Sequence, residues 1–207
     1  MKIAIMQPYF FPYEGYFRLF TKTDLFVIYD CVQFPRRGWV HRNKFINLSG
    51  NLEWLTLPIK KVSRDVKIRD LEFQDDSQEI WMERIGQFPL LKEHLQDNKD
   101  LHEVVTNLDC SVIDYLINNL AYVCKERGVH FNIVRSSELK IDESLKGQDR
   151  IIEIAKRIGA IEYINLPGGK LLYDQNKFLE EGITLSFLDN EDCKKNSMLE
   201  LIINKKC

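Results

Sequence analysis

Short apolar runs alternate along this chain with amphipathic stretches, which is typical of alternating strands and helices. Residues 2–6 (KIAIM) and 25–29 (LFVIY) have the pattern of buried strands, and the stretch 13–21 between them predicts a helix. Strand, helix and strand in close succession predict a βαβ unit with parallel strands and a right-handed crossover. Further strands are expected at 53–59, 129–134, 162–165 and 183–188.

Amphipathic patterns predict the remaining helices at 77–88, 90–96, 111–127, 148–158 and 197–204. Pro89 separates the first two, Asp109 is expected to cap the third, and Gly128 is expected to end it. Residues 35–69 suggest irregular structure and hairpins, and Pro58 favours an edge or an end of the strand 53–59. The predicted fold is α/β and Rossmann-like, a mainly parallel sheet with flanking helices and a helical insertion. With no linker, repeat or low-complexity tract, residues 1–207 are expected to form one domain.

Composition places the chain among ordinary globular proteins. Of its 207 residues 44% are hydrophobic and 29% charged, which excludes disordered and collagen-like classes. No apolar run approaches the ~18 residues of a membrane span, and the N-terminal stretch does not match a signal peptide. The five cysteines are far apart and the four histidines lack ligand spacing, so we expect reduced thiols, a cytoplasmic location and no metal site.

The net charge of −2 conceals a basic block between residues 36 and 69. It holds nine basic residues and two acids, a local charge of +7 that leaves −9 elsewhere: Arg36, Arg37, Arg42, Lys44, Lys60, Lys61, Arg64, Lys67 and Arg69, with Glu53 and Asp65. A basic block in an acidic protein favours recognition of a small anionic molecule over a nucleic-acid surface, although a solvated basic face is the alternative. Neither nucleic acid nor membrane insertion is expected, and homo-oligomerisation is left open.

The first candidate site follows the strand 2–6. Gln7 can offer its amide to a ligand, Pro8 fixes the loop, and Gly15 with Tyr16 starts a helix whose N-terminus favours an anion. Phe10 and Phe11, in the same loop, are expected in the core instead.

The second candidate site follows the strand 25–29 and runs into the basic block. Asp30, near Gln33, can act as a general base, or it can simply stabilise a turn. Two arginines of the block, Arg37 and Arg42, suit phosphate or carboxylate.

Four further residues of this block complete the second candidate site. Trp39 can stack on a base or sugar, and Lys60 can complete an anion pocket. Asn43 stands next to the arginines, and His41 is a candidate base or a structural histidine.

A third candidate site follows the strand 162–165. Asn165 ends that strand, and the turn at Gly168 and Gly169 can expose backbone N–H groups to an anion, with Tyr173 beyond. The same residues are equally compatible with a plain strand-ending turn. Signatures of P-loop, dinucleotide-binding, α/β-hydrolase and zincin enzymes are absent from the sequence.

Several segments in order resemble the WbqC-like family: QPYFFPYEGYF, DLFVIYDCVQF, RRGWVHRNK, WLTLPIKK, EYINLPGGKLLY and SMLELIINK. The resemblance covers nearly the whole chain. Two positions depart from the family pattern, because Cys31 stands where a second Asp is usual and His41 where Asn is usual. The first departure weakens an acid–base role for a carboxylate pair. The matching positions are Gln7, Pro8, Pro12, Gly15, Tyr16, Asp30, Gln33, Arg37, Trp39, Arg42, Asn43, Pro58, Lys60, Asn165, Gly168 and Gly169.

The resemblance implies a role in bacterial surface-polysaccharide and O-antigen synthesis. The leading hypothesis is an aminoacyl (glycine-type) or acyl transferase acting on a nucleotide-activated sugar, with Asp30 or His41 as base. The nucleotide sugar and an acyl or aminoacyl donor would then be substrates, and no cofactor is assigned. An ATP-dependent carboxylate-activating enzyme and a non-catalytic metabolite-binding or scaffold protein are the two alternatives.

Overall fold

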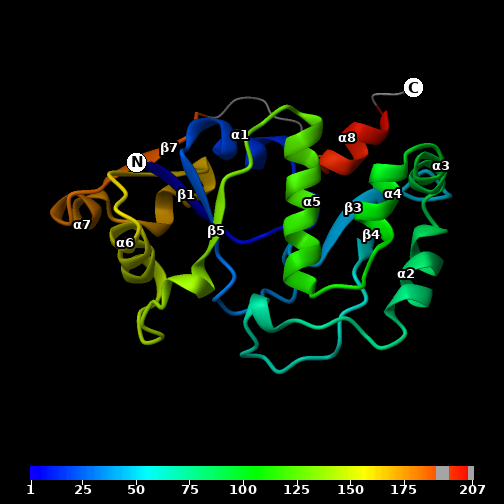
Figure 1. Ribbon diagram of the computed structural model, residues 1–207, viewed down its shortest axis with the longest axis horizontal. Coiled ribbons are helices and arrows are strands. Elements are labelled where there is room, and N and C mark those ends of the chain that lie inside the picture. The colour runs from blue at the N-terminus through cyan, green and yellow to red at the C-terminus, as the bar shows by residue number, and fades with distance from the viewer. Residues whose placement is uncertain (190–195, 205–207) are drawn as a thin grey trace.

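The computed structural model describes residues 1–189 and 196–204 of the chain. Its centre is a five-stranded sheet in the order β5-β2-β1-β6-β7, in which all neighbouring strands run parallel (Figure 1). The strands are β1 (Lys2–Met6), β2 (Leu25–Ile28), β5 (Ile133–Arg135), β6 (Glu162–Asn165) and β7 (Thr184–Phe187). The predicted α/β, Rossmann-like sheet is confirmed.

Helices cover both faces of this sheet because side chains alternate along its strands. Ala4 of β1 faces the core beneath α1 (Glu14–Lys22) and α5 (Val112–Glu126), together with aromatic side chains of α1. Its neighbours Ile3 and Ile5 face the opposite core, beneath α6 (Gly147–Arg157) and α7 (Gln175–Glu180). The runs of apolar residues in the strands are therefore buried on both sides, as in other parallel sheets.

The segment between β2 and β5 forms the helical insertion. It contains an antiparallel hairpin of β3 (Arg42–Ile46) and β4 (Leu52–Thr56), and then α2 (Ser77–Ile85), α3 (Pro89–Asp97) and α4 (Lys99–Thr106). Figure 1 shows α5 between this insertion and the sheet. The buried Trp81 links two helices of the insertion, because its indole N–H on α2 donates to the Val105 carbonyl on α4 at 2.7 Å. At the C-terminal end, α8 (Met198–Asn204) packs against α3.

Most predicted elements are confirmed, and three details of the prediction are wrong. Ser111, not Asp109, caps α5, because the Ser111 hydroxyl accepts from the Asp114 N–H at 3.1 Å. The strand expected at 129–134 begins only at Ile133, since the backbone after Gly128 first closes the helix end. The strand expected at 53–59 is β4, which ends at Thr56, so Pro58 lies beyond its end.

Five described helical elements were not predicted from the sequence. They are α4, α7 and the 3₁₀ segments Ile68–Asp70, Ser136–Leu139 and Pro167–Leu172.

The sheet reverses its winding between β1 and β6, since β2 and β5 lie on one side of β1 while β6 and β7 lie on the other. In such sheets ligands bind beyond the carboxyl ends of the strands at this reversal. The loop that starts at Gln7 and the turn that follows Asn165 leave the sheet here. Among the described residues, no helix has the length and apolar character needed to span a membrane.

Candidate functional site

The loop after β1 is held in a strained conformation by two side chains, Asn43 and Ser197, and the Ser197 hydroxyl donates to the Phe11 carbonyl at 2.9 Å. The Asn43 amide donates to the carbonyls of Phe10 and Phe11, at 2.9 and 2.8 Å. Phe11 has a φ of +42°, a backbone region that bulky residues rarely occupy. Both phenylalanine side chains are fully buried, as expected. Strain of this kind persists only where surrounding contacts enforce it, and it is common at ligand sites.

This loop forms one wall of a pocket of about 310 Å³, which we call the aromatic pocket. Its lining residues are Tyr9, Pro12, Tyr13, Trp39 and Asn43. Burial, and then the neighbouring Tyr13, raise the pKa of Tyr9, so its hydroxyl remains a neutral hydrogen-bonding group. The pocket combines planar apolar walls with a few polar atoms, which is the usual composition of a small-molecule site.

Gly15 makes room for the pocket wall. A Cβ atom at Gly15 would lie 2.5 Å from the Tyr13 ring, so any larger residue would displace that ring. The space beside Gly15 at the start of α1 is therefore occupied by Tyr13 of the chain itself.

Two cations lie beside the aromatic pocket. The Trp39 and Trp54 rings are 5.0 Å apart between centroids. The Arg42 guanidinium carbon lies 4.2 Å from the Trp54 centroid, and the Lys44 ammonium lies 5.1 Å from it. Arg42 also donates to the Arg37 carbonyl at 2.9 Å, which fixes its guanidinium. A ligand stacked on Trp39 would therefore have fixed positive charge nearby.

Gln7 lies above the carboxyl end of β1 with its amide unoccupied. The buried Tyr16 hydroxyl donates to the Gln7 carbonyl at 2.9 Å, which places Tyr16 in a supporting role. Pro8 is also buried. No described residue forms a hydrogen bond with the Gln7 side chain, which is half-buried at the sheet reversal. Its expected contact with a ligand stays a prediction.

Asp30 belongs to a buried polar network at the carboxyl end of β2. It is 1% exposed, and its carboxylate accepts from the Ser136 hydroxyl at 2.9 Å and from the Ser137 hydroxyl at 2.6 Å. The Ser137 N–H donates to it as well, at 2.9 Å. These contacts join β2 to the turn after β5. A role for Asp30 as a base stays a prediction. Its observed contacts hold the end of β2 against the segment after β5, which is a positioning role. The exposed Gln33 donates to the Arg64 carbonyl at 2.8 Å.

His41 and Lys60 lie together, away from the lining of the aromatic pocket. The His41 ring packs edge-on against Phe34, with 4.9 Å between centroids. Burial, and then the Arg42 charge, lower the pKa of His41 to about 4, so the imidazole is neutral at neutral pH. The Lys60 ammonium lies 3.1 Å from both Glu72 and Asp75, and these carboxylates raise its pKa. The basic block therefore divides into separate groups.

The turn after β6 forms a third group. The Asn165 side chain accepts from the Leu166 N–H at 2.7 Å, and a Cβ at Gly169 would lie 2.5 Å from its amide nitrogen. Gly168 is exposed. Tyr173 packs on Tyr163 and lines a separate surface pocket next to β7. That this turn and the basic block share one cleft stays a prediction.

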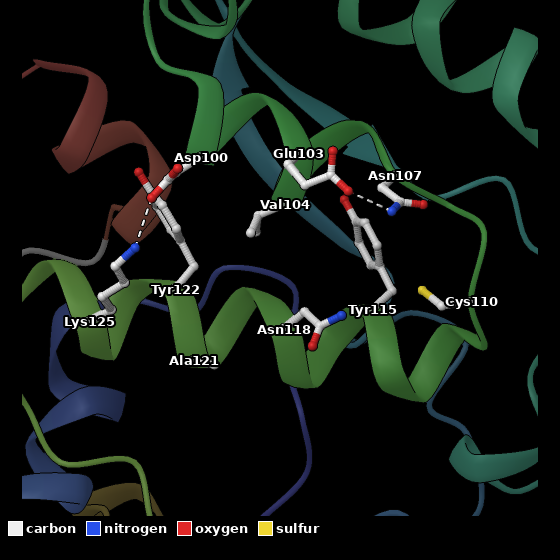
Figure 2. Close-up of a pocket in the computed structure, with 10 residues that line it drawn as sticks. All are labelled: Asp100, Glu103, Val104, Asn107, Cys110, Tyr115, Asn118, Ala121, Tyr122 and Lys125. Carbon is white, nitrogen blue, oxygen red and sulfur yellow. Dashed lines mark hydrogen bonds and ion pairs between the residues drawn. The ribbon is translucent and has the colours of Figure 1, made fainter.

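A groove of about 570 Å³ lies between α4 and α5, on the insertion (Figure 2). Figure 2 shows an ion pair between Lys125 and Asp100 at one end and a hydrogen bond between Asn107 and Glu103 at the other. None of the sequence-predicted site residues lines this groove. We therefore place the candidate site at the aromatic pocket.

Three aromatic residues of this site were not among the sequence candidates: Tyr9, Tyr13 and Trp54. The first two belong to the aromatic run after β1, in which Phe10 and Phe11 are buried in the core while Tyr9 and Tyr13 line the pocket. Trp54 pairs with Lys44 across the hairpin, a relationship that depends on strand register. Among the described residues, no three His, Cys, Asp or Glu side chains form a metal-binding group. Cys31 and Cys124 are buried and Cys110 is half-buried, while Cys193 and Cys207 lie outside the described residues.

The fold and the pocket define a Rossmann-like α/β protein with an aromatic pocket at the carboxyl edge of its sheet. The chain belongs to the WbqC-like protein family, whose model matches residues 7–196. It is similar to the uncharacterized protein Rv1507c of Mycobacterium tuberculosis (strain ATCC 25618 / H37Rv), with 28% identity over 198 residues, covering 91% of this chain and 82% of the relative. No solved structure matches the chain.

Proposed function

We propose that the chain binds a nucleotide-activated sugar at the aromatic pocket and transfers an aminoacyl or acyl group to it in surface-polysaccharide synthesis. The observation that carries this proposal is the pairing of stacking surfaces with fixed cations. Trp39 and the two tyrosines can stack on a base or sugar, and Arg42 and Lys44 can attract the diphosphate. The polysaccharide context comes from the family resemblance.

The transfer needs an activated acyl donor, such as a thioester, and an amine or hydroxyl of the sugar as acceptor. The acceptor atom forms a bond to the acyl carbon, the bond from that carbon to the leaving group breaks, and the acceptor's proton passes to a base. His41 is neutral at neutral pH and can take a proton, whereas the Asp30 carboxylate already accepts three hydrogen bonds. Neither residue lines the aromatic pocket, so the choice between Asp30 and His41 as the base stays a prediction.

A binding function without catalysis is the second candidate. Two observations support this candidate. The Asp30 side chain is buried, and the low pKa of His41 makes its imidazole a weak base at neutral pH. Metabolite binding without turnover of any acyl donor would favour this candidate over the transferase.

Thermal-shift measurements with nucleotide sugars, nucleotides, acyl-CoAs and amino acids test the site. A ligand at a hundred times its dissociation constant adds about 2.7 kcal/mol of stability, a shift of several degrees. We expect a nucleotide-sugar shift that is lost in Trp39→Ala and Arg42→Gln. The control Arg64→Gln removes an exposed charge of the same block outside the pocket and should keep the shift. An equal response of all three variants would contradict the assigned site.

A further inference from the structure

A second hollow, of about 350 Å³, shares no lining residue with the aromatic pocket, and we call it the basic pocket. Arg36, Lys60, Lys61 and His41 line it, together with apolar residues that include Phe34 and Ile59. None of the described side chains that line it is acidic. Its volume is at the lower end of the range for ligand sites.

Two of the three cations at this pocket carry uncompensated charge. Lys60 is already paired with Glu72 and Asp75. Arg36 and Lys61 have no carboxylate partner among the described residues. The Arg36 guanidinium is nevertheless held in place, because one of its Nη atoms donates to the Val62 carbonyl at 2.7 Å. A fixed guanidinium with free N–H groups is well suited to the oxygen atoms of an oxyanion.

His41 adds a neutral donor to this arrangement. Its side chain is buried, and its Nδ1 atom is enclosed with no hydrogen-bond partner among the described residues. A buried N–H without an acceptor is rarer than an acceptor without a donor, so the favoured tautomer carries its proton on Nε2. Because Nδ1 is enclosed, the edge of the ring that reaches the pocket is the one that carries Nε2.

We propose that the basic pocket binds a phosphoryl group, with Arg36 and Lys61 supplying charge and His41 supplying an N–H donor. The charged residues of this site, Arg36 and Lys61, take no part in the proposed transfer, so the proposal can fail or hold independently of the transferase function. Inorganic phosphate, a sugar phosphate and a nucleoside diphosphate share this chemistry. The pocket can hold the phosphoryl end of either larger molecule.

Calorimetric titration with inorganic phosphate tests the proposal on the full chain. We expect Arg36→Gln and Lys61→Gln each to weaken phosphate binding by about tenfold, equivalent to about 1.4 kcal/mol. Arg64→Gln, which removes an exposed charge of the same segment outside the pocket, should leave the affinity almost unchanged. Lys61 is exposed, so that variant is expected to fold normally. Nitrogen-detected NMR should show phosphate shifting the His41 ring signals and sparing those of the exposed His130.

Four outcomes would overturn the proposal: no phosphate binding, an equal loss in all three variants, unchanged His41 signals, or acetate binding as tightly as phosphate. Parallel titrations with UDP and glucose 1-phosphate identify the source of the phosphoryl group. If either binds more tightly than inorganic phosphate and loses affinity in Arg36→Gln, the pocket holds the phosphoryl end of that larger molecule.

Discussion

The Arg150 guanidinium donates a hydrogen bond to the Cys31 sulfur at 3.1 Å, and both side chains are buried. The same guanidinium also donates to the carbonyls of Asp142 and Leu145, at 2.9 and 3.3 Å. Its Nε atom has no partner, and Arg150 forms no ion pair with a carboxylate among the described residues. A buried cation without a counter-ion lowers the free energy of unfolding, so the stability of the chain should depend on the charge at residue 31.

We predict that Cys31→Asp stabilises the chain at neutral pH. A carboxylate at this position can pair with Arg150, and a hydrogen bond to a charged group contributes about 2 kcal/mol. Cys31→Asn is the matched control, because it has nearly the same shape without the charge. Urea unfolding should show Cys31→Asp to be more stable than Cys31→Asn by about that amount. If the two are equally stable, the Arg150 charge is compensated in another way.

The loop after β1 depends on Asn43, whose amide holds two buried carbonyls. We predict that Asn43→Ala lowers the free energy of unfolding by about 2 kcal/mol, because the Phe10 carbonyl loses its donor while the Phe11 carbonyl keeps Ser197, and a buried group without a partner costs ~1–3 kcal/mol. Asn118→Ala, at an exposed position on α5, should change it by less than ~0.5 kcal/mol. Chemical unfolding of both variants provides the comparison, and similar losses in the two would show that the Asn43 contacts contribute little.

The local pattern of the sequence predicted the sheet well because apolar runs such as 2–6 and 162–165 are buried on both faces and correspond to whole strands. It did not predict the network around Asp30. Ser136 and Ser137 are more than a hundred residues away in the chain, and only the pairing of β2 with β5 brings them together.

The local sequence pattern also could not predict that the basic block divides into separate groups of residues. Lys60 meets Glu72 and Asp75 through the folding of an irregular segment, for which periodicity gives no signal. Likewise, the pairing of Trp54 with Lys44 depends on the register of the β3–β4 hairpin.

The contacts of Asp30 lead to a third prediction. Its carboxylate accepts hydrogen bonds from two serine hydroxyls and one N–H, so Asp30→Asn should lower the free energy of unfolding by about 2 kcal/mol. Asp24→Asn is the control, since Asp24 accepts from the Lys2 N–H at an exposed position and should change stability much less. Thermal and urea unfolding measure both effects. A fully stable Asp30→Asn variant would favour a functional reason for this carboxylate over a structural one.

The buried His41 leads to a prediction about pH. Its pKa is lowered from 6.5 to about 4 by burial and by Arg42, so the unfolded chain binds this proton more readily than the folded one. Stability is therefore complete above pH ~6.5 and declines as the pH falls towards ~4, by about 3 kcal/mol for a shift of this size. His41→Gln removes the titrating group, and the exposed His130→Gln is its control. Urea unfolding between pH 7 and pH 4 should show a smaller decline for His41→Gln than for the other two proteins. Parallel declines in all three would place the proton uptake at other groups.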